Sequence, residues 1–200
     1  MTEHVLREIR PKGEQALSLS VLLRDSETVT LTVGRSVYDA VGAPAVGESL
    51  STEQYGVLLR EHGRREAYRA AIRILECGSP SGKALYLKLL RKGVSRENAD
   101  FAVSRMKELG YIREGEQARA LAASMVRRNL WGPRRVYAAL CEKGYSGKDA
   151  SEAIAAACDA GEIDFAEARR ALLQRETGKG APPEKLRAVL YRYGYRVGDE

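Results

Sequence analysis

The feature of this sequence that most constrains its fold is an internal repeat of about 50 residues. Three similar segments align on Gly93, Gly144 and Gly194, which lie 51 and 50 residues apart. A leucine stands four residues before each of these glycines (Leu89, Leu140 and Leu190). A second anchor agrees, because Gly-Tyr-Ile at 110–112 returns as Gly-Glu-Ile at 161–163, again 51 residues later. Two independent anchors with one period predict a tandem-repeat protein whose units pack on their neighbours.

Each repeat has the apolar periodicity of short helices. The predicted helices cover 66–77, 82–92 and 96–109 in the first repeat, 115–129, 133–143 and 147–160 in the second, and 164–176 and 183–193 in the third. Pro133 and Pro183 suit a first helical turn, and the repeated glycines suit the left-handed residue that ends a helix. The third repeat lacks its last helix, so it is either degenerate or cut short. Helices of about 12 residues are marginal alone, so packing between them must stabilise the array.

Side chains at helical spacing define the predicted core faces. One set is Ala99, Ala102, Val103, Met106 and Leu109, and another is Leu121, Ala122, Met125 and Leu130. Ser146 and Asp164 each stand three residues before an acidic residue, which is the arrangement of a helix-capping box. Three cysteines lie in apolar helical stretches, which favours buried structural thiols (Cys77, Cys141 and Cys158).

The N-terminal quarter has a different pattern. Apolar residues alternate with polar ones in 17–23 and 29–33, on either side of a polar turn, which predicts a β-hairpin with 5–9 as a possible third strand. Glycine and proline then interrupt the chain before Ser51, which can cap a helix. His62 beside Gly63 indicates the end of that helix.

The predicted fold is therefore mostly α, with tandem three-helix repeats forming an elongated array and a small β-rich N-terminal unit. The predicted divisions are the β-rich unit at 1–50, a linking helix at 51–65, and repeats at 66–112, 113–162 and 163–200.

The basic residues are distributed unevenly along the chain. The net charge is +6, yet residues 1–65 hold 8 Lys/Arg against 9 Asp/Glu, and residues 66–200 hold 25 against 18. The helical part carries the whole basic excess, which favours an anionic partner such as nucleic acid or an acidic protein surface.

Several protein classes are excluded by what the sequence lacks. No secretory leader is recognisable, and no apolar run approaches the roughly 18 residues of a membrane span. Three cysteines without a CxxC pair and only two histidines argue against a zinc site or a disulfide framework and favour a reducing cytoplasm. The segment 178–181 lacks the spacing of a phosphate loop, and no nucleophile stands near a histidine. We expect no enzyme, no cofactor and no metal site.

Three features of the helical part share a pattern with a known family. They are the repeat itself, the segment 87–93 (Leu-Lys-Leu-Leu-Arg-Lys-Gly) with the turn 109–112, and the segment 127–136 (Arg-Arg-Asn-Leu-Trp-Gly-Pro-Arg-Arg-Val) leading into 139–144. In these residues, roughly 66–196, the chain resembles the RecX family of RecA regulators. The N-terminal unit resembles an extension found in some members. The chain departs from the family at 113–116, where Arg-Glu-Gly-Glu replaces a frequent acidic pair, and in the missing last helix.

The resemblance implies a cytoplasmic protein that binds the filament of RecA on single-stranded DNA. Lying along the filament groove, such a protein impedes filament growth and so dampens strand exchange and ATP hydrolysis in recombination and DNA repair. We expect it to act as a monomer without a membrane partner.

The densest basic feature is the group Arg127, Arg128, Arg134 and Arg135, which flanks Trp131. These arginines stand at the end of one predicted helix and the start of the next, so their guanidinium groups could converge on a carboxylate or a phosphate. The alternative is a solvated helix face, with Trp131 packed in the hinge between helices. Further candidates are Lys88, Arg91 and Lys92 in the first repeat, Lys185 and Arg187 in the third, and Arg169 and Arg170. These too could be ordinary polar faces of amphipathic helices.

Two other functions remain open. Trihelical units also occur in helix-turn-helix proteins, so direct DNA binding is the alternative to a protein partner. A helical scaffold for an unrelated protein is the other. A net charge of +7 over 135 residues is modest for a protein that relies on DNA affinity alone, which favours a protein partner.

Overall fold

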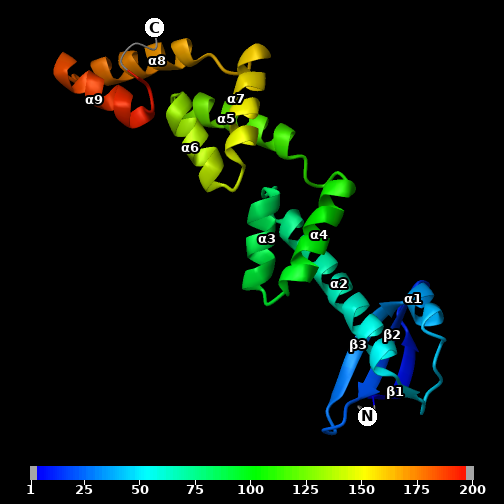
Figure 1. Cartoon of the computed structure of the whole chain (residues 1–200). Helices are drawn as coiled ribbons and strands as arrows, with labels where there is room; N and C mark the ends of the chain where they lie inside the picture. Colours follow the sequence, from blue (N-terminus) through cyan, green and yellow to red (C-terminus); the bar gives the residue numbers. More distant parts are fainter. Residues whose placement is uncertain (1–3, 197–200) are drawn as a thin grey trace. The chain divides into compact units, whose positions relative to one another are not determined.

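The structure is a computed structural model, in which residues 4–196 are described. In this range it contains four strands and nine helices (Figure 1). The chain forms two compact units, which we describe separately. The first comprises the residues up to Ile74 together with Leu89–Arg105, and the second comprises Leu75–Lys88 together with the chain from Met106 onward. None of the described helices is long and apolar enough to cross a membrane.

An antiparallel sheet forms the start of the first unit. Its strands are β1 (His4–Pro11), β2 (Ala16–Leu22), β3 (Thr28–Gly34) and β4 (Ser49–Leu50), in the order β3-β2-β1-β4. The predicted hairpin is confirmed, with Leu19 opposite Leu31, and so is the third strand. Two short elements were not predicted, namely β4 and the helix α1 (Arg35–Ala40).

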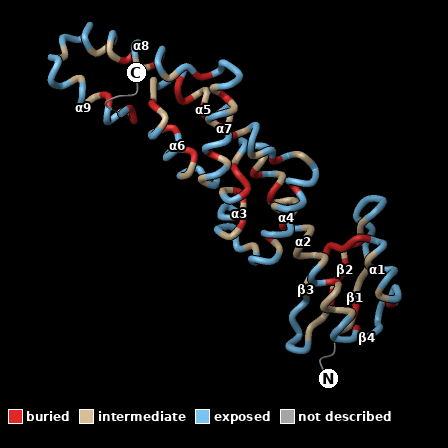
Figure 2. The backbone as a smooth tube through the Cα atoms, turned by 45° about the horizontal axis from the view of Figure 1, so that its top comes forward, coloured by how far each residue is buried: buried red, intermediate tan, exposed pale blue. Residues whose placement is uncertain are grey.

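One face of this sheet is the core of the unit. The alternating residues Leu17, Leu19 and Val21 of β2 are each at most 4% exposed. They share a cluster with buried residues at the end of β3 and with Tyr38 of α1 and Leu58 of α2 (Thr52–Glu76). Figure 2 shows buried positions in the sheet of this unit. The β-rich unit predicted at 1–50 therefore needs the start of α2 to complete its core.

The predicted break between a linking helix at 51–65 and a repeat helix at 66–77 is wrong. The helix α2 runs without interruption through both segments, and His62 and Gly63 lie inside it. Ser51 caps it as predicted, because Gln54 N–H donates to Ser51 Oγ at 3.1 Å and Ser51 N–H donates to Gln54 Oε1 at 2.8 Å. Packing explains why a glycine stands at position 63, because a Cβ there would collide with the side chain of Asn98 on α4 (Arg96–Glu108). A close helix–helix approach thus explains the glycine that suggested a helix end.

The second repeat is complete and has its own core. Its helices are α5 (Glu114–Asn129), α6 (Pro133–Glu142) and α7 (Gly147–Asp159), which match the predicted ranges within about one residue. Small buried side chains let α5 and α7 pack closely, namely Ala118 and Ala122 on α5 and Ala150, Ala153 and Ala157 on α7. Val136 and Leu140 of α6 complete this core. The predicted register is confirmed, because Leu140 and its counterpart Leu89 on α3 (Gly82–Arg91) are fully buried.

The third repeat has α8 (Phe165–Gly178) and α9 (Pro183–Tyr193), as predicted. Leu172, Leu190 and Tyr195 form its small core. No further helix follows α9 within the residues described, which end at 196.

The predicted helix ends are confirmed in detail. Ser146 and Asp149 form a capping box, and Asp164 Oδ1 accepts the N–H of Glu167 at 2.9 Å. The three aligned glycines have φ values of +81°, +94° and +90°, in the left-handed region that favours glycine. Two predicted burials are wrong, since Leu109 is 42% exposed and Cys77 is exposed. Leu109 directly follows α4 and Cys77 directly follows α2, so the helical spacing that predicted their burial no longer applies there.

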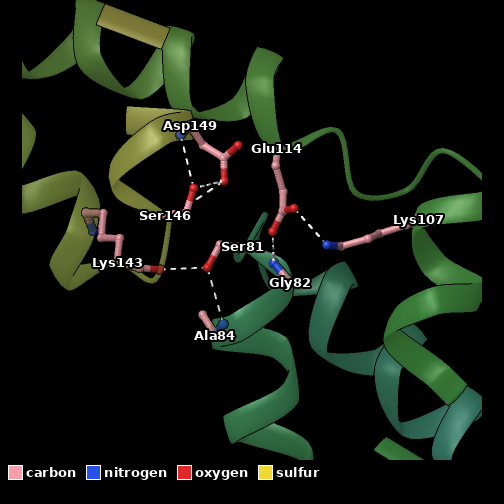
Figure 3. Close-up of polar contacts among 8 residues, drawn as sticks. All are labelled: Ser81, Gly82, Ala84, Lys107, Glu114, Lys143, Ser146 and Asp149. Atoms are coloured by element: carbon pink, nitrogen blue, oxygen red, sulfur yellow. Dashed lines mark hydrogen bonds and ion pairs between the residues drawn. The ribbon is translucent and has the colours of Figure 1, made fainter. Parts of the chain in front are cut away.

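One joint links successive repeats within the second unit. The Ser81 hydroxyl, just before α3, donates to the carbonyl oxygen of Lys143 at 2.7 Å and accepts Ala84 N–H at 3.2 Å (Figure 3). Beside it, Glu114 accepts hydrogen bonds from Gly82 N–H at 2.9 Å and from Lys107 Nζ at 2.7 Å. The start of α3 is thereby held on the glycine turn that ends α6.

The same joint recurs one repeat later. Gly132, 51 residues after Ser81, donates its backbone N–H to the carbonyl oxygen of Tyr193 at 2.7 Å. Gly194 fits tightly, because a Cβ on it would lie 2.5 Å from the backbone nitrogen of Arg135. The corresponding position in the third repeat is Pro182, which has neither an N–H nor a hydroxyl to donate.

Candidate functional site

The predicted basic group lies where α5 ends and α6 begins. Leu130 ends α5 in the left-handed conformation, with φ of +56°, and Pro133 begins α6. Three residues thus separate the two helices, and the chain turns sharply between the arginine pairs.

Arg135 faces inward rather than toward a partner. Its guanidinium carbon lies 4.4 Å from the centre of the Trp131 ring and 5.6 Å from that of Tyr193. Its Nη1 donates to the carbonyl oxygen of Arg192 at 2.9 Å. Trp131 is half-buried against the core of the second repeat. Arg135 and Trp131 therefore stabilise the joint between the second and third repeats.

The other arginines of this group do not converge on one point. Arg127 lines a cavity of about 270 Å³ beside Glu162, Asp164 and Glu167. Arg134 lines a different cavity of about 640 Å³, beside Tyr137 and Ile154. The expectation that four guanidinium groups meet at one corner is wrong. The two pairs stand on separate helices, with the left-handed residue Leu130 at the end of α5 between them.

Two of the three acidic residues near Arg127 are already engaged, namely Glu162 and Asp164. Arg119 binds Glu162 with two hydrogen bonds of 3.0 and 2.7 Å, which lowers the pKa of the Glu162 carboxyl group. Asp164 caps α8. This corner is therefore a structural ion-pair site, and within residues 4–196 no cluster of three or more potential metal ligands is present.

Seven of the eight remaining predicted cations are exposed to solvent. Lys88, Arg91 and Lys92 of the first repeat are exposed, as are Arg128, Arg170, Lys185 and Arg187. Arg169 is half-buried, and its Nε has no hydrogen-bond partner. Among the described residues, none of these eight side chains lies within ion-pair distance of a carboxylate. They are available to bind anions.

A second basic feature, in the first unit, was missed by the sequence analysis. Arg64, Arg65 and Arg69 of α2 and Arg105 of α4 line one cavity of about 340 Å³, together with Tyr68, Phe101 and Glu61. The signal was the helical spacing of Arg65 and Arg69, four residues apart, with Arg64 beside them in the sequence. The predicted helix break at 65 hid it, because that break assigned these arginines to two different helices.

Nothing in the described residues suggests catalysis. Burial raises the pKa of Cys158, and nearby acidic residues act in the same direction. A raised pKa makes this thiol a poor nucleophile. Burial also raises the pKa of Tyr145 and raises that of Tyr195 to about 12, so both phenols stay protonated at neutral pH.

Curated proteins resemble this chain over most of their length. Regulatory protein RecX of Stenotrophomonas maltophilia is 36% identical over 121 residues, which cover 58% of this chain and 71% of that protein. Regulatory protein RecX of Caldanaerobacter subterraneus subsp. tengcongensis is 26% identical over 151 residues, which cover 76% of this chain and 75% of that protein. No family model matches the chain.

Solved structures share the fold. A crystal structure of a regulatory protein RecX superposes with a TM-score of 0.71 at 16% identity and covers 96% of this chain and 95% of its own. RecX from Lactobacillus salivarius superposes with a TM-score of 0.56 at 17% identity and covers 68% and 90%. The identity to these structures is low enough that they support the fold alone, whereas the curated relatives support the family. This chain belongs to the RecX family of regulatory proteins.

Proposed function

We propose that this chain regulates the RecA recombinase by binding the RecA filament on single-stranded DNA and limiting its growth. ATP hydrolysis and strand exchange by the filament fall as a consequence. Membership of the RecX family carries this proposal. The protein acts as a binding partner, in the cytoplasm, and catalyses no reaction itself.

The exposed cations of the repeats support this function. Arg128, Arg91 and Lys92 stand at helix ends, and Lys185 and Arg187 lie on α9, all without a carboxylate partner among the described residues. A guanidinium group can bind a carboxylate or a phosphate with two parallel hydrogen bonds. A recombinase filament offers both groups, on its protein surface and on its DNA.

The repeat architecture supplies the rigidity that such binding needs. The joints at Ser81 and Gly132 fix successive repeats of the second unit through backbone carbonyl oxygens. Side chains that stand on fixed helices lose less entropy on binding than side chains on mobile loops. The second unit therefore presents its cations in a defined arrangement.

The test is DNA-dependent ATP hydrolysis by RecA from the same organism, with this protein added well below one molecule per RecA. Inhibition at such ratios is expected, because blocking a growing filament end affects many subunits. The proposal fails if hydrolysis is unchanged at equimolar protein. A helix-turn-helix-like DNA-binding function would then be indicated by tight, salt-sensitive binding to bare DNA.

A further inference from the structure

The cavity between α2 and α4 contains four arginines and two aromatic side chains within about 340 Å³. Glu61 is the only acidic residue among the described residues that line it. The volume lies in the range of small-molecule and nucleotide sites, roughly 300–1,000 Å³. This cavity is separate from the basic group at the end of α5.

Carboxylates hold two of these arginines in place. Arg65 Nε donates to Glu61 Oε1 at 2.6 Å, and Arg69 Nη1 donates to Glu66 Oε1 at 2.9 Å. A guanidinium group has five N–H donors, so each arginine keeps further donors for a ligand. Ion pairs along α2 thus orient the arginines without using up their binding capacity.

The third arginine is held by an aromatic ring. The guanidinium carbon of Arg64 lies 4.9 Å from the centre of the Phe101 ring, and its Nη2 lies 3.8 Å from Glu97 Oε1, at the outer limit of an ion pair. The Nε of Arg64 is buried and has no hydrogen-bond partner, which is an unusual cost for a charged group. Phe101 is 37% exposed although it is a large apolar side chain.

We propose that this cavity binds single-stranded nucleic acid, with a phosphate on the arginines and a base against Phe101 or Tyr68. Arginine forks that alternate with aromatic rings are the chemistry by which proteins hold unpaired strands. An acidic peptide would satisfy the arginines but would leave the exposed aromatic rings without a matching flat partner. The chain would then contact the DNA of a filament directly, through its first unit.

The test uses the full chain and a fluorescein-labelled oligo(dT), with no recombinase present, and measures fluorescence anisotropy. The variant R64Q/R69Q is expected to bind at least about tenfold more weakly at low salt, with a salt slope shallower by about 1.4, since each lost contact on a single strand removes about 0.7. The matched control is R60Q/R73Q, which removes the same charge from exposed positions of the same helix outside the cavity. The control is expected to lose less than about threefold.

A further variant tests the contact between a base and the Phe101 ring. F101L keeps an apolar side chain and is expected to lose affinity for oligo(dT) but not for an abasic oligonucleotide of the same length, because only bases stack. Circular dichroism establishes that each variant is folded. Equal losses in R64Q/R69Q and R60Q/R73Q, or tighter binding to a poly-glutamate peptide than to oligo(dT), would overturn the proposal.

This experiment is independent of the proposed regulation. Oligonucleotide binding without inhibition of RecA would support the strand site and contradict the regulatory function. Inhibition of RecA by a protein that does not bind oligo(dT) would support the regulatory function and contradict the strand site.

Discussion

His62 takes part in a contact that no local pattern could reveal. Its Nδ1 accepts the backbone N–H of Thr32, on the edge strand β3, at 2.9 Å. An edge strand offers unpaired N–H groups that favour unwanted strand pairing, and a side chain that caps one of them reduces this risk. The hydrogen-bond partner lies 30 residues away in the sequence, so no local pattern predicts this contact. From the sequence alone, His62 beside Gly63 predicted only a helix end.

Replacing His62 with Ala is expected to lower the free energy of unfolding by about 1–3 kcal/mol. Thr32 is 4% exposed, so its N–H would remain buried without an acceptor, which costs about this much. Urea denaturation followed by circular dichroism measures the change. A loss below about 0.5 kcal/mol would mean that water replaces the imidazole.

Gly194 is expected to be far less tolerant of substitution than Gly93. Both have positive φ, so alanine costs about 1 kcal/mol at either position for the backbone conformation alone. A Cβ at Gly194 would also lie 2.5 Å from the backbone nitrogen of Arg135, whereas a Cβ at Gly93 meets nothing within 4 Å. G194A should therefore lose about 3 kcal/mol or more in urea denaturation, and G93A about 1 kcal/mol. Equal losses would show that the joint around Gly194 is looser than described.

Tyr195 makes stability depend on alkaline pH. Burial raises its pKa to about 12 in the folded protein, against about 10 in an unfolded chain. Between these values the unfolded state gives up its proton more readily, so stability is fully present below pH 10 and declines as the pH rises toward 12. Urea midpoints at pH 9, 10 and 11 should fall less steeply for Y195F than for the unaltered protein. An identical fall would show that other groups cause the dependence.

At the scale of helices and strands, the two interior glycines of α2 are expected to respond oppositely to alanine. A Cβ at Gly56 would make an ordinary contact of 3.5 Å with Arg60 Nη1. G56A should therefore stabilise the fold by roughly 0.5–1 kcal/mol through helix propensity. A Cβ at Gly63 would collide with Asn98 of α4, so G63A should destabilise it.

The pair G63A and G63A/N98A separates the collision from other effects. Removing the Asn98 side chain should restore most of the stability that G63A loses, because the two changes act on one contact. Thermal unfolding measures both. If G63A/N98A is as unstable as G63A, the loss does not come from the contact between residue 63 and Asn98.

Elements with strong periodicity could be predicted from sequence, and elements held by distant contacts could not. The helices of the second repeat carry capping residues, proline and glycine at their ends, and their predicted bounds are confirmed. The strand β4 has two residues and exists because it pairs with β1. The helix α2 continues through Gly63 despite the weak helix propensity of glycine, and the close approach of Asn98 leaves no room for a Cβ there.

At the scale of the whole molecule, the candidate site could be predicted only in part. The basic excess of the helical part and the exposed side chains that carry it follow from composition and amphipathic spacing. The inward position of Arg135 depends on Tyr193 and the Arg192 carbonyl group, which are more than 50 residues away. The arginine cavity depends on α4 approaching α2, and no local pattern encodes that approach.

The arginines around Trp131 should consequently divide into two classes. Replacing Arg127, Arg128 and Arg134 together with Gln is expected to weaken binding to RecA filaments at least about tenfold, with helical content unchanged, because these side chains do not belong to a core. R135Q should instead lower thermal stability, since it removes contacts to Trp131 and Tyr193. Co-sedimentation with filaments and thermal unfolding measure the two effects. Unchanged filament binding by the triple variant would contradict the assignment of Arg127, Arg128 and Arg134 to the binding surface.

The proline at the start of α9 has a consequence for how such arrays can evolve. Duplication of a repeat lengthens an array only when the last unit can receive the next one. In the two joints found among residues 4–196, the residue at the helix start is Ser81 or Gly132, and each donates a hydrogen bond to the glycine turn of the following repeat. Pro182 cannot donate one. A serine in place of Pro182 would supply this donor again, so one residue decides whether the start of α9 could form the joint that the starts of α3 and α6 form.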